Sequence, residues 1–220
     1  GRPEVLKVLQ SQDMLPAITF IFSRAGCDGA LYQCLRSRMV LTSQEEAQQI
    51  KDIVDAGVEG IPEEDLQVLD FKRWREALSR GFAAHHAGML PAFRHIVEDL
   101  FVRGLVRAVF ATETLALGIN MPARTVVLEK LIKFNGEAHV DLTPGQYTQL
   151  TGRAGRRGID TLGNAVVQWA PAMDPRQVAG LASTRTYPLI STFAPGYNMA
   201  INLLGMLGFE DSLRLLEKSF

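Results

Sequence analysis

Two arginines interleaved with glycines stand out in the segment from Gln149 to Gly158, which reads QLTGRAGRRG. Arg153 and Arg156 are three positions apart, so on a helix they would share one face. The neighbouring glycines would let a phosphate or a second domain approach the backbone closely. Planar guanidinium groups suit bidentate contact with phosphate oxygens, and an arginine finger stabilises the charge that spreads in phosphoryl transfer. A solvated basic turn, or an Arg-Gly tract that touches RNA, explains the same residues, so this segment alone leaves the choice open.

A second polar segment, ATETLALGINMP, covers residues 111–122 and directly follows a predicted strand. Thr112 and Thr114 carry hydroxyl groups that suit contact with nucleic-acid phosphates. Gly118 permits a tight turn, and Asn120 places a polar side chain beside it. An ordinary capped turn between a strand and a helix is the alternative interpretation.

Two further predicted strands end in polar or glycine-containing turns. Ser23 and Arg24 follow one of them, and His86 and Gly88 follow another. Ligands of parallel sheets gather beyond the carboxyl ends of the strands, so these turns are candidates for a binding edge. A metal site is disfavoured, because the adjacent His85 and His86 would point to opposite faces of a strand and no familiar metal-ligand spacing is present.

The elements that must position these residues alternate along the chain. Short apolar runs predict strands at residues 15–23, 82–86, 105–111, 124–129 and 163–169, with helical segments between them. This order predicts an α/β fold with a parallel sheet and helices on both faces. Asn135-Gly136 predicts a hairpin within residues 133–140. Beyond residue 172 the pattern is helical only, so we expect one domain over residues 1–172 and a second, incomplete segment over residues 173–220.

Composition narrows the classes of function. The chain has 220 residues with a net charge of −1, which excludes a wholly basic nucleic-acid binder and requires any phosphate contact to be local. Cys27 and Cys34 lie seven positions apart in one predicted helix, about 10.5 Å at helical rise, which is too far for a disulfide. No apolar run approaches a membrane span and no signal-peptide core opens the chain. We therefore expect reduced thiols and a cytoplasmic location, without membrane contact.

Four segments resemble helicase motifs IV, IVa, V and VI, in that order along the chain. They are FIFSRAGCD, AAHHAGMLP, VFATETLALGINMPA and QLTGRAGRRG. Their spelling is similar to that of superfamily-two DExH RNA helicases of the superkiller and TRAMP type, with the bacterial HelY branch closest. The resemblance covers nearly the whole chain, and GYNMAINLL and LEKSF resemble the start of that family's winged-helix domain. It implies the second RecA-like motor domain of an ATP-dependent 3′-to-5′ RNA helicase.

The resemblance also implies a role for each motif residue. Arg153 and Arg156 would be arginine fingers that reach the γ-phosphate of ATP. The remaining residues of the nucleotide side would be Gly118, Asn120 and Gln149. The residues that face the nucleic-acid backbone would be Ser23, Arg24, His86, Gly88, Thr112, Glu113 and Thr114. The Asn135-Gly136 hairpin resembles the element that helps to separate duplex strands, although a simple hairpin at a sheet edge explains it equally well.

Two motifs of a complete ATPase are missing from these 220 residues. No glycine is followed by lysine, which excludes a P-loop, and no Asp-Glu pair could hold Mg²⁺. We therefore expect ATP and Mg²⁺ to be held mainly by the first RecA-like domain, and the chain alone to be inactive. Expected partners are that domain, single-stranded or 3′-tailed RNA, and an RNA-degrading nuclease. A DNA-repair helicase domain and a non-catalytic RNA- or partner-binding module remain as alternatives.

Overall fold

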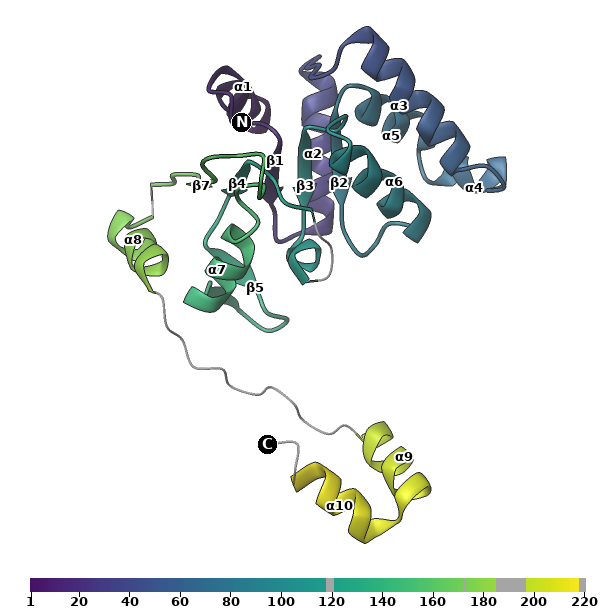
Figure 1. Cartoon of the computed structure of the whole chain (residues 1–220), viewed down its shortest axis with the longest axis vertical. Helices are drawn as coiled ribbons and strands as arrows, with labels where there is room; N and C mark the ends of the chain where they lie inside the picture. The colour runs from purple at the N-terminus through teal and green to yellow at the C-terminus, as the bar shows by residue number, and fades with distance from the viewer. Residues whose placement is uncertain (118–120, 172, 185–196, 218–220) are drawn as a thin grey trace. The chain divides into compact units, whose positions relative to one another are not determined.

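The computed structural model describes residues 1–117, 121–171, 173–184 and 197–217 (Figure 1). The chain divides into two compact units, Gly1–Thr184 and Arg185–Phe220. The predicted division at residues 172 and 173, with its winged-helix assignment, stays a prediction. In the second unit the structure describes two helices, α9 (Tyr197–Leu207) and α10 (Phe209–Glu217), which contact each other.

The first unit is built on a parallel sheet of five strands in the order β2-β3-β1-β4-β7. The strands are short, and four of them are buried along their whole length. Their bounds are β1 (Ala17–Phe20), β2 (Phe82–His85), β3 (Ala108–Ala111), β4 (Thr125–Leu128) and β7 (Asn164–Val167). This arrangement confirms the predicted α/β class and parallel sheet.

Helices cover both faces of the sheet, because alternate strand residues point to opposite sides. On one face Ala17, Phe82 and Phe110 pack against α1 (Arg2–Ser11) and α2 (Arg24–Arg36). On the other face Ile18, Phe20 and Val109 belong to a larger core. The helices that contribute buried residues to this core are α3 (Gln44–Gly57), α5 (Phe71–Ser79), α6 (Pro91–Val102), α7 (Pro144–Thr151) and α8 (Pro175–Ser183). Figure 1 shows α3, α5 and α6 grouped beside β2, and α7 near β4.

Two local features differ from the expected elements. The helical segment predicted between the strands at residues 15–23 and 82–86 is interrupted. Its last part forms α4 (Glu63–Val68) and α5, which are separated because Asp70 adopts a left-handed conformation with φ of 51°. The first helix, α1, was not predicted. It begins with a proline in its first turn and buries only Pro3, Leu6 and Leu9, which is too weak a pattern to stand out in the sequence.

The predicted hairpin is present as a separate two-stranded antiparallel sheet. It pairs β5 (Ile132–Phe134) with β6 (His139–Asp141). Gly136 has φ of 107°, which suits glycine in the turn, and the Asn135 side chain accepts hydrogen bonds from the N–H groups of Glu137 and Ala138. Cys27 and Cys34 are buried in α2 and neither forms a disulfide.

Candidate functional site

The arginine loop, defined as residues 152–158, follows directly from α7. Thr143 caps this helix with a capping box that includes Gln146, and Gly152 ends it. Arg153 and Arg156 therefore lie in a loop after the helix, and the prediction that they share a helix face is wrong. Gly155 explains the difference, because its φ of 89° is incompatible with a continuing right-handed helix.

The backbone of the arginine loop is fixed to the segment that precedes β4. The N–H of Ala123 donates to the carbonyl of Arg153 at 2.9 Å, and the N–H of Gly155 donates to the carbonyl of Ala123 at 2.7 Å. Gly163 packs so closely on the other side that a Cβ there would lie 2.6 Å from the Ala154 carbonyl carbon. The loop is thus held between two backbone segments at the amino edge of the sheet.

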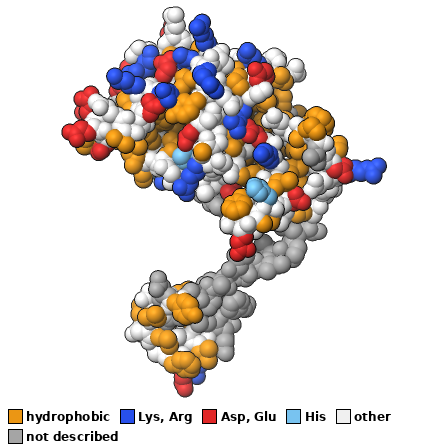
Figure 2. All heavy atoms as spheres, turned by 180° about the vertical axis from the view of Figure 1, so that it is seen from behind, with side chains coloured by type: hydrophobic (Ala, Val, Ile, Leu, Met, Phe, Trp, Pro, Cys, Tyr) orange, Lys and Arg blue, Asp and Glu red, His pale blue; other side chains and the backbone are white. Residues whose placement is uncertain are grey.

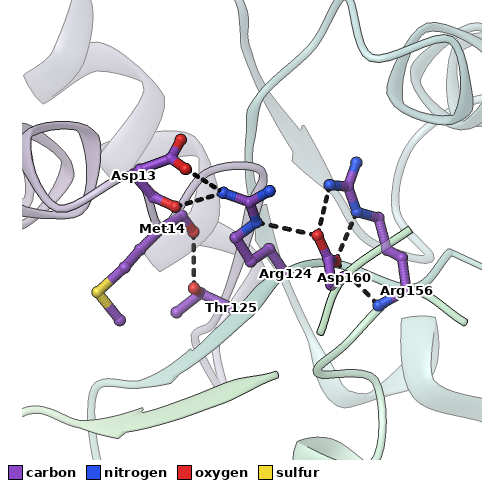
Figure 3. A network of polar contacts seen from close by, with 6 residues as sticks. All are labelled: Asp13, Met14, Arg124, Thr125, Arg156 and Asp160. Carbon is purple, nitrogen blue, oxygen red and sulfur yellow. Dashed lines mark hydrogen bonds and ion pairs between the residues drawn. The ribbon is translucent and has the colours of Figure 1, made fainter. Parts of the chain in front are cut away.

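Arg156 makes a two-pronged ion pair with Asp160. Its Nε and Nη2 each donate to the carboxylate at 2.8 Å, and its backbone N–H donates to Oδ2 at 3.0 Å (Figure 3). The Asp160 side chain is 1% exposed and that of Arg156 is 22% exposed. The guanidinium is consequently fixed in direction while part of it still reaches the surface.

Asp160 also binds a second arginine, which extends the pair into a four-residue chain. Arg124 donates from Nε to Asp160 at 3.0 Å and from Nη1 to the Asp13 carboxylate at 2.7 Å (Figure 3). The Arg156 guanidinium, aided by Arg124, outweighs burial and holds the pKa of Asp160 well below its usual range. Asp160 is therefore ionised at neutral pH.

Of the other residues predicted for the nucleotide side, the structure describes two and leaves two outside the described ranges. Gln149 is an exposed residue of α7, and Arg153 is partly buried just beyond its end. Gly118 and Asn120 lie outside the described residues. Gln149 therefore lies in the last turn of α7, and Arg153 and Arg156 lie in the loop that follows it.

The residues predicted to face nucleic acid lie at the opposite, carboxyl edge of the sheet. Ser23 is exposed and accepts a hydrogen bond from the Gly26 N–H at 3.1 Å, so its hydroxyl caps α2. His86 accepts from the Gly88 N–H through Nδ1 at 3.2 Å, which leaves the proton on Nε2 for Asp28 at 3.1 Å.

The Arg24 side chain lies beside His86 and Gly88. A Cβ added to Gly88 would lie 3.3 Å from Cδ of Arg24 and 3.1 Å from Nδ1 of His86. The absence of a side chain at Gly88 therefore lets the exposed Arg24 pass over the turn. The structure thus brings Arg24, His86 and Gly88 together at the carboxyl edge.

Thr112, Glu113 and Thr114 complete the carboxyl edge. The Thr112 N–H donates to the carbonyl of His85 at 3.3 Å, which places the end of β3 beside the end of β2. The hydroxyl groups of Thr112 and Thr114 are 2.9 Å apart. Glu113 opens the short 3₁₀ helix η1 (Glu113–Leu117) and pairs with Lys133 of the β5–β6 hairpin at 2.7 Å.

A pocket of about 260 Å³ opens between the start of α2 and the hairpin. Its lining includes Ser23, Gly26, Lys133, Phe134 and His139. The rings of Phe134 and His139 have centroids 5.5 Å apart, and Phe134 is 56% exposed. The pocket therefore combines a helix start, a cation and an exposed aromatic side chain. The molecular face in Figure 2 mixes acidic and basic side chains.

The adjacent histidines do not share a ligand position. His85 is buried and contacts Glu98 of α6 through Nε2 at 2.8 Å, whereas His86 contacts Asp28 of α2 on the other side of the sheet. Burial lowers the pKa of His85 and so favours its neutral form. Within the described ranges, no three His, Cys, Asp or Glu side chains gather as metal ligands. No helix in the described part of the chain is long and apolar enough to cross a membrane.

Sequence reasoning missed several residues that shape these two edges. Asp160 follows Arg156 by four positions, a spacing that signals an ion pair and could have been found. Asp13 and Arg124 are 111 positions apart, and no local pattern indicates their contact. Lys133 and Gly163 were likewise identified only by their neighbours in space.

Comparison with known proteins identifies relatives of this sequence. The helicase conserved C-terminal domain matches residues 63–158, which include most of both edges. The chain is 66% identical over its full length to the probable helicase HelY of Mycobacterium tuberculosis, of which it covers 24%.

More distant relatives match along nearly the same stretch. The chain is 34% identical over 217 residues to the human exosome RNA helicase MTR4, covering 99% of the chain and 20% of that protein. It is 35% identical over 205 residues to the antiviral helicase SKI2 of Saccharomyces cerevisiae, covering 92% of the chain and 16% of that protein. The chain spans about a quarter or less of the length of these relatives. Over nearly its whole length the chain is therefore related in sequence to the helicases HelY, MTR4 and SKI2, and it contains the helicase conserved C-terminal domain.

Proposed function

We propose that the chain supplies the second motor domain of an ATP-dependent 3′-to-5′ RNA helicase. Two of its relatives, MTR4 and DExH15 of Arabidopsis thaliana, are RNA helicases by name, and MTR4 is named for the exosome. An RNA-degrading nuclease is the corresponding partner to test, and a cytoplasmic location stays a prediction.

One observation carries the proposal: an oriented guanidinium group near the surface at the end of α7. Arg156 is fixed by Asp160 and keeps 22% of its side chain exposed. An arginine that only stabilised the fold would gain nothing from exposure, whereas an arginine finger must be both rigid and reachable. Arg153 lies in the same loop and would act beside it.

ATP and Mg²⁺ would be held mainly outside this chain, because the sequence has no P-loop and no Asp-Glu pair. When bound, ATP supplies the γ-phosphoryl group that is transferred to water. The exposed and half-buried polar groups at the end of α7 suit a contribution from one side: Gln149, Arg153 and Arg156 offer donors to phosphate oxygens. Their work is to orient the phosphate and stabilise its developing charge.

The carboxyl edge would hold the nucleic-acid strand. Hydroxyl groups of Thr112 and Thr114 and the guanidinium of Arg24 are donors of the kind that contact phosphates. In the neighbouring pocket, Lys133 adds a cation and Phe134 an exposed ring on which a base can stack. Nucleotide chemistry would then take place at one edge and strand binding at the other, and a helicase motor couples these two activities.

Single substitutions in the complete helicase test this division. Arg156→Ala should lower RNA-stimulated ATP turnover by about 10³-fold, because it removes a contact made in the transition state. It also removes the ion pair with Asp160, but RNA affinity should stay within about twofold because the residues of the carboxyl edge are unchanged. Thr112→Ala should weaken RNA affinity and leave its salt dependence unchanged, because the lost hydroxyl is uncharged. Arg157→Ala is the matched control, since this neighbouring arginine is exposed and has the same charge.

Unchanged turnover in Arg156→Ala would contradict the finger assignment and favour a binding module. Affinities for matched RNA and DNA single strands address the remaining alternative. Equal or tighter binding of DNA would favour a DNA-repair helicase, because the 2′-hydroxyl is the feature that distinguishes the two strands.

A further inference from the structure

Asp160 is the most thoroughly bonded acid at the arginine loop, and the motifs assign it no role. Its side chain is 1% exposed and accepts from two guanidinium groups and one backbone N–H. A buried carboxylate needs such partners. Fold stability alone, however, does not require that one of those partners be an arginine expected to meet a phosphate.

The geometry of the Arg156 contact is side-on. Nε and Nη2 face the Asp160 carboxylate, and these are the two nitrogens along one edge of the guanidinium plane. In the described part of the chain, Nη1 of Arg156 has no hydrogen-bond partner. The end-on edge, with both terminal nitrogens, therefore remains available for a second planar or tetrahedral oxyanion.

Asp160 itself is prevented from turning. Oδ1 accepts from Nη2 of Arg156 at 2.8 Å and from Nε of Arg124 at 3.0 Å, and Oδ2 accepts from Nε and the backbone N–H of Arg156 (Figure 3). Arg124 is anchored in turn by Asp13, which precedes β1. The carboxylate is thus tied to the amino edge of the sheet through a second, independent arginine.

An unrestrained arginine side chain samples many rotamers, and ordering it during the reaction costs free energy. A guanidinium already held along one edge avoids that cost and keeps its direction. The same arrangement, in which an outer carboxylate orients an inner functional group, is common around catalytic residues.

We propose that Asp160 is a positioning residue for Arg156, holding its guanidinium side-on so that the end-on edge meets the γ-phosphate. The proposal rests on the finger role of Arg156 proposed above. Asp160 touches neither substrate nor nucleotide, so its effect on turnover must pass through Arg156.

The test is a double-mutant cycle in the complete helicase, with kcat and KM for ATP measured at saturating RNA. Asp160→Asn should lower kcat by about 10²-fold, the scale of a misplaced catalytic group, with KM within about threefold. In the Arg156→Ala background, Asp160→Asn should lower kcat by no more than about twofold further. Non-additivity of this kind identifies groups that act as a unit.

Asp55→Asn is the matched control, because Asp55 accepts from Nε and Nη2 of Arg75 in the same side-on way but has no contact with the arginine loop. It should leave kcat within about threefold of the parent. If Asp160→Asn does not fold, Asp160→Glu replaces it, since it keeps the charge and displaces the carboxylate by one methylene. That variant should also lower kcat in the parent background and not in the Arg156→Ala background.

Two outcomes would overturn the positioning role while leaving the finger intact. One is wild-type kcat in a folded Asp160→Asn protein when Arg156→Ala is impaired. The other is an equal loss in both backgrounds, which indicates a purely structural acid. Wild-type turnover in Arg156→Ala itself would instead refute the proposed function, and the positioning role with it.

Discussion

Replacing Gly163 by alanine should destabilise the chain, because this glycine packs directly on the backbone of the arginine loop. A Cβ at this position would lie 2.6 Å from the carbonyl carbon and oxygen of Ala154 and from the nitrogen of Gly155. These are backbone atoms within a segment already hydrogen-bonded to Ala123, so they cannot turn aside as a flexible side chain would.

The expected cost follows from this geometry. Overpacking a well-packed site lowers the free energy of unfolding by about 1–3 kcal/mol. Because the new Cβ would clash with three backbone atoms, we expect Gly163→Ala to lie at the upper end, about 3 kcal/mol. For a chain of this size that corresponds to a melting temperature lowered by about 6–12 °C. Thermal unfolding of the 220-residue chain, followed by circular dichroism, measures it directly.

Gly29→Ala is the matched control. Gly29 lies within α2, and a Cβ there would meet no atom within 4 Å. Alanine is the better helix former, so this variant should be stabilised by about 0.5–1 kcal/mol. The two identical chemical changes should therefore shift the melting temperature in opposite directions. A Gly163→Ala protein that melts at or above the parent temperature would refute the close packing described for the arginine loop.

Two further predictions concern ion pairs. The stability that Asp160 contributes should be complete above the usual carboxyl pKa. It should decline as pH falls towards the lowered pKa of the folded state, because the unfolded state takes up the proton first. In urea unfolding, the free energy of unfolding should therefore fall less between pH 7 and pH 3 for Asp160→Asn than for the parent. Lys133→Ala should cost about 0.2–1 kcal/mol by removing the pair with Glu113, and exchanging the two residues should recover that loss in the same unfolding assay. A parent and an Asp160→Asn protein with the same pH dependence, or an exchanged pair no more stable than Lys133→Ala, would contradict these assignments.

Much of the sheet could be predicted from sequence because four of its five strands are short, apolar and buried along their whole length. Residues 82–86 and 105–111 contain β2 and β3, and polar turns follow both strands where the sequence placed them. The Asn135-Gly136 turn was equally clear, since its left-handed glycine is a local requirement. Local patterns of this kind need no knowledge of distant residues.

The arrangement of the site was less accessible. Glycine at position 155 was interpreted as freedom for a ligand to approach, whereas the structure uses its positive φ to turn Arg153 and Arg156 away from a shared helix face. The separation of the amino and carboxyl edges depends on the position of β4 in the sheet, and the spacing of motifs along the sequence does not indicate that position. Asp13 and Arg124 meet only because the segments before β1 and β4 lie side by side.

We propose that this chain supplies one half of an ATPase site and cannot hydrolyse ATP without the other half. The most direct measurement is the RNA-stimulated ATP hydrolysis rate of the purified chain, alone and after the first motor domain is added back. We expect background hydrolysis by the chain alone and RNA-stimulated hydrolysis only with both parts. Hydrolysis by the chain alone above background would contradict it, because no P-loop is present to cradle the phosphates.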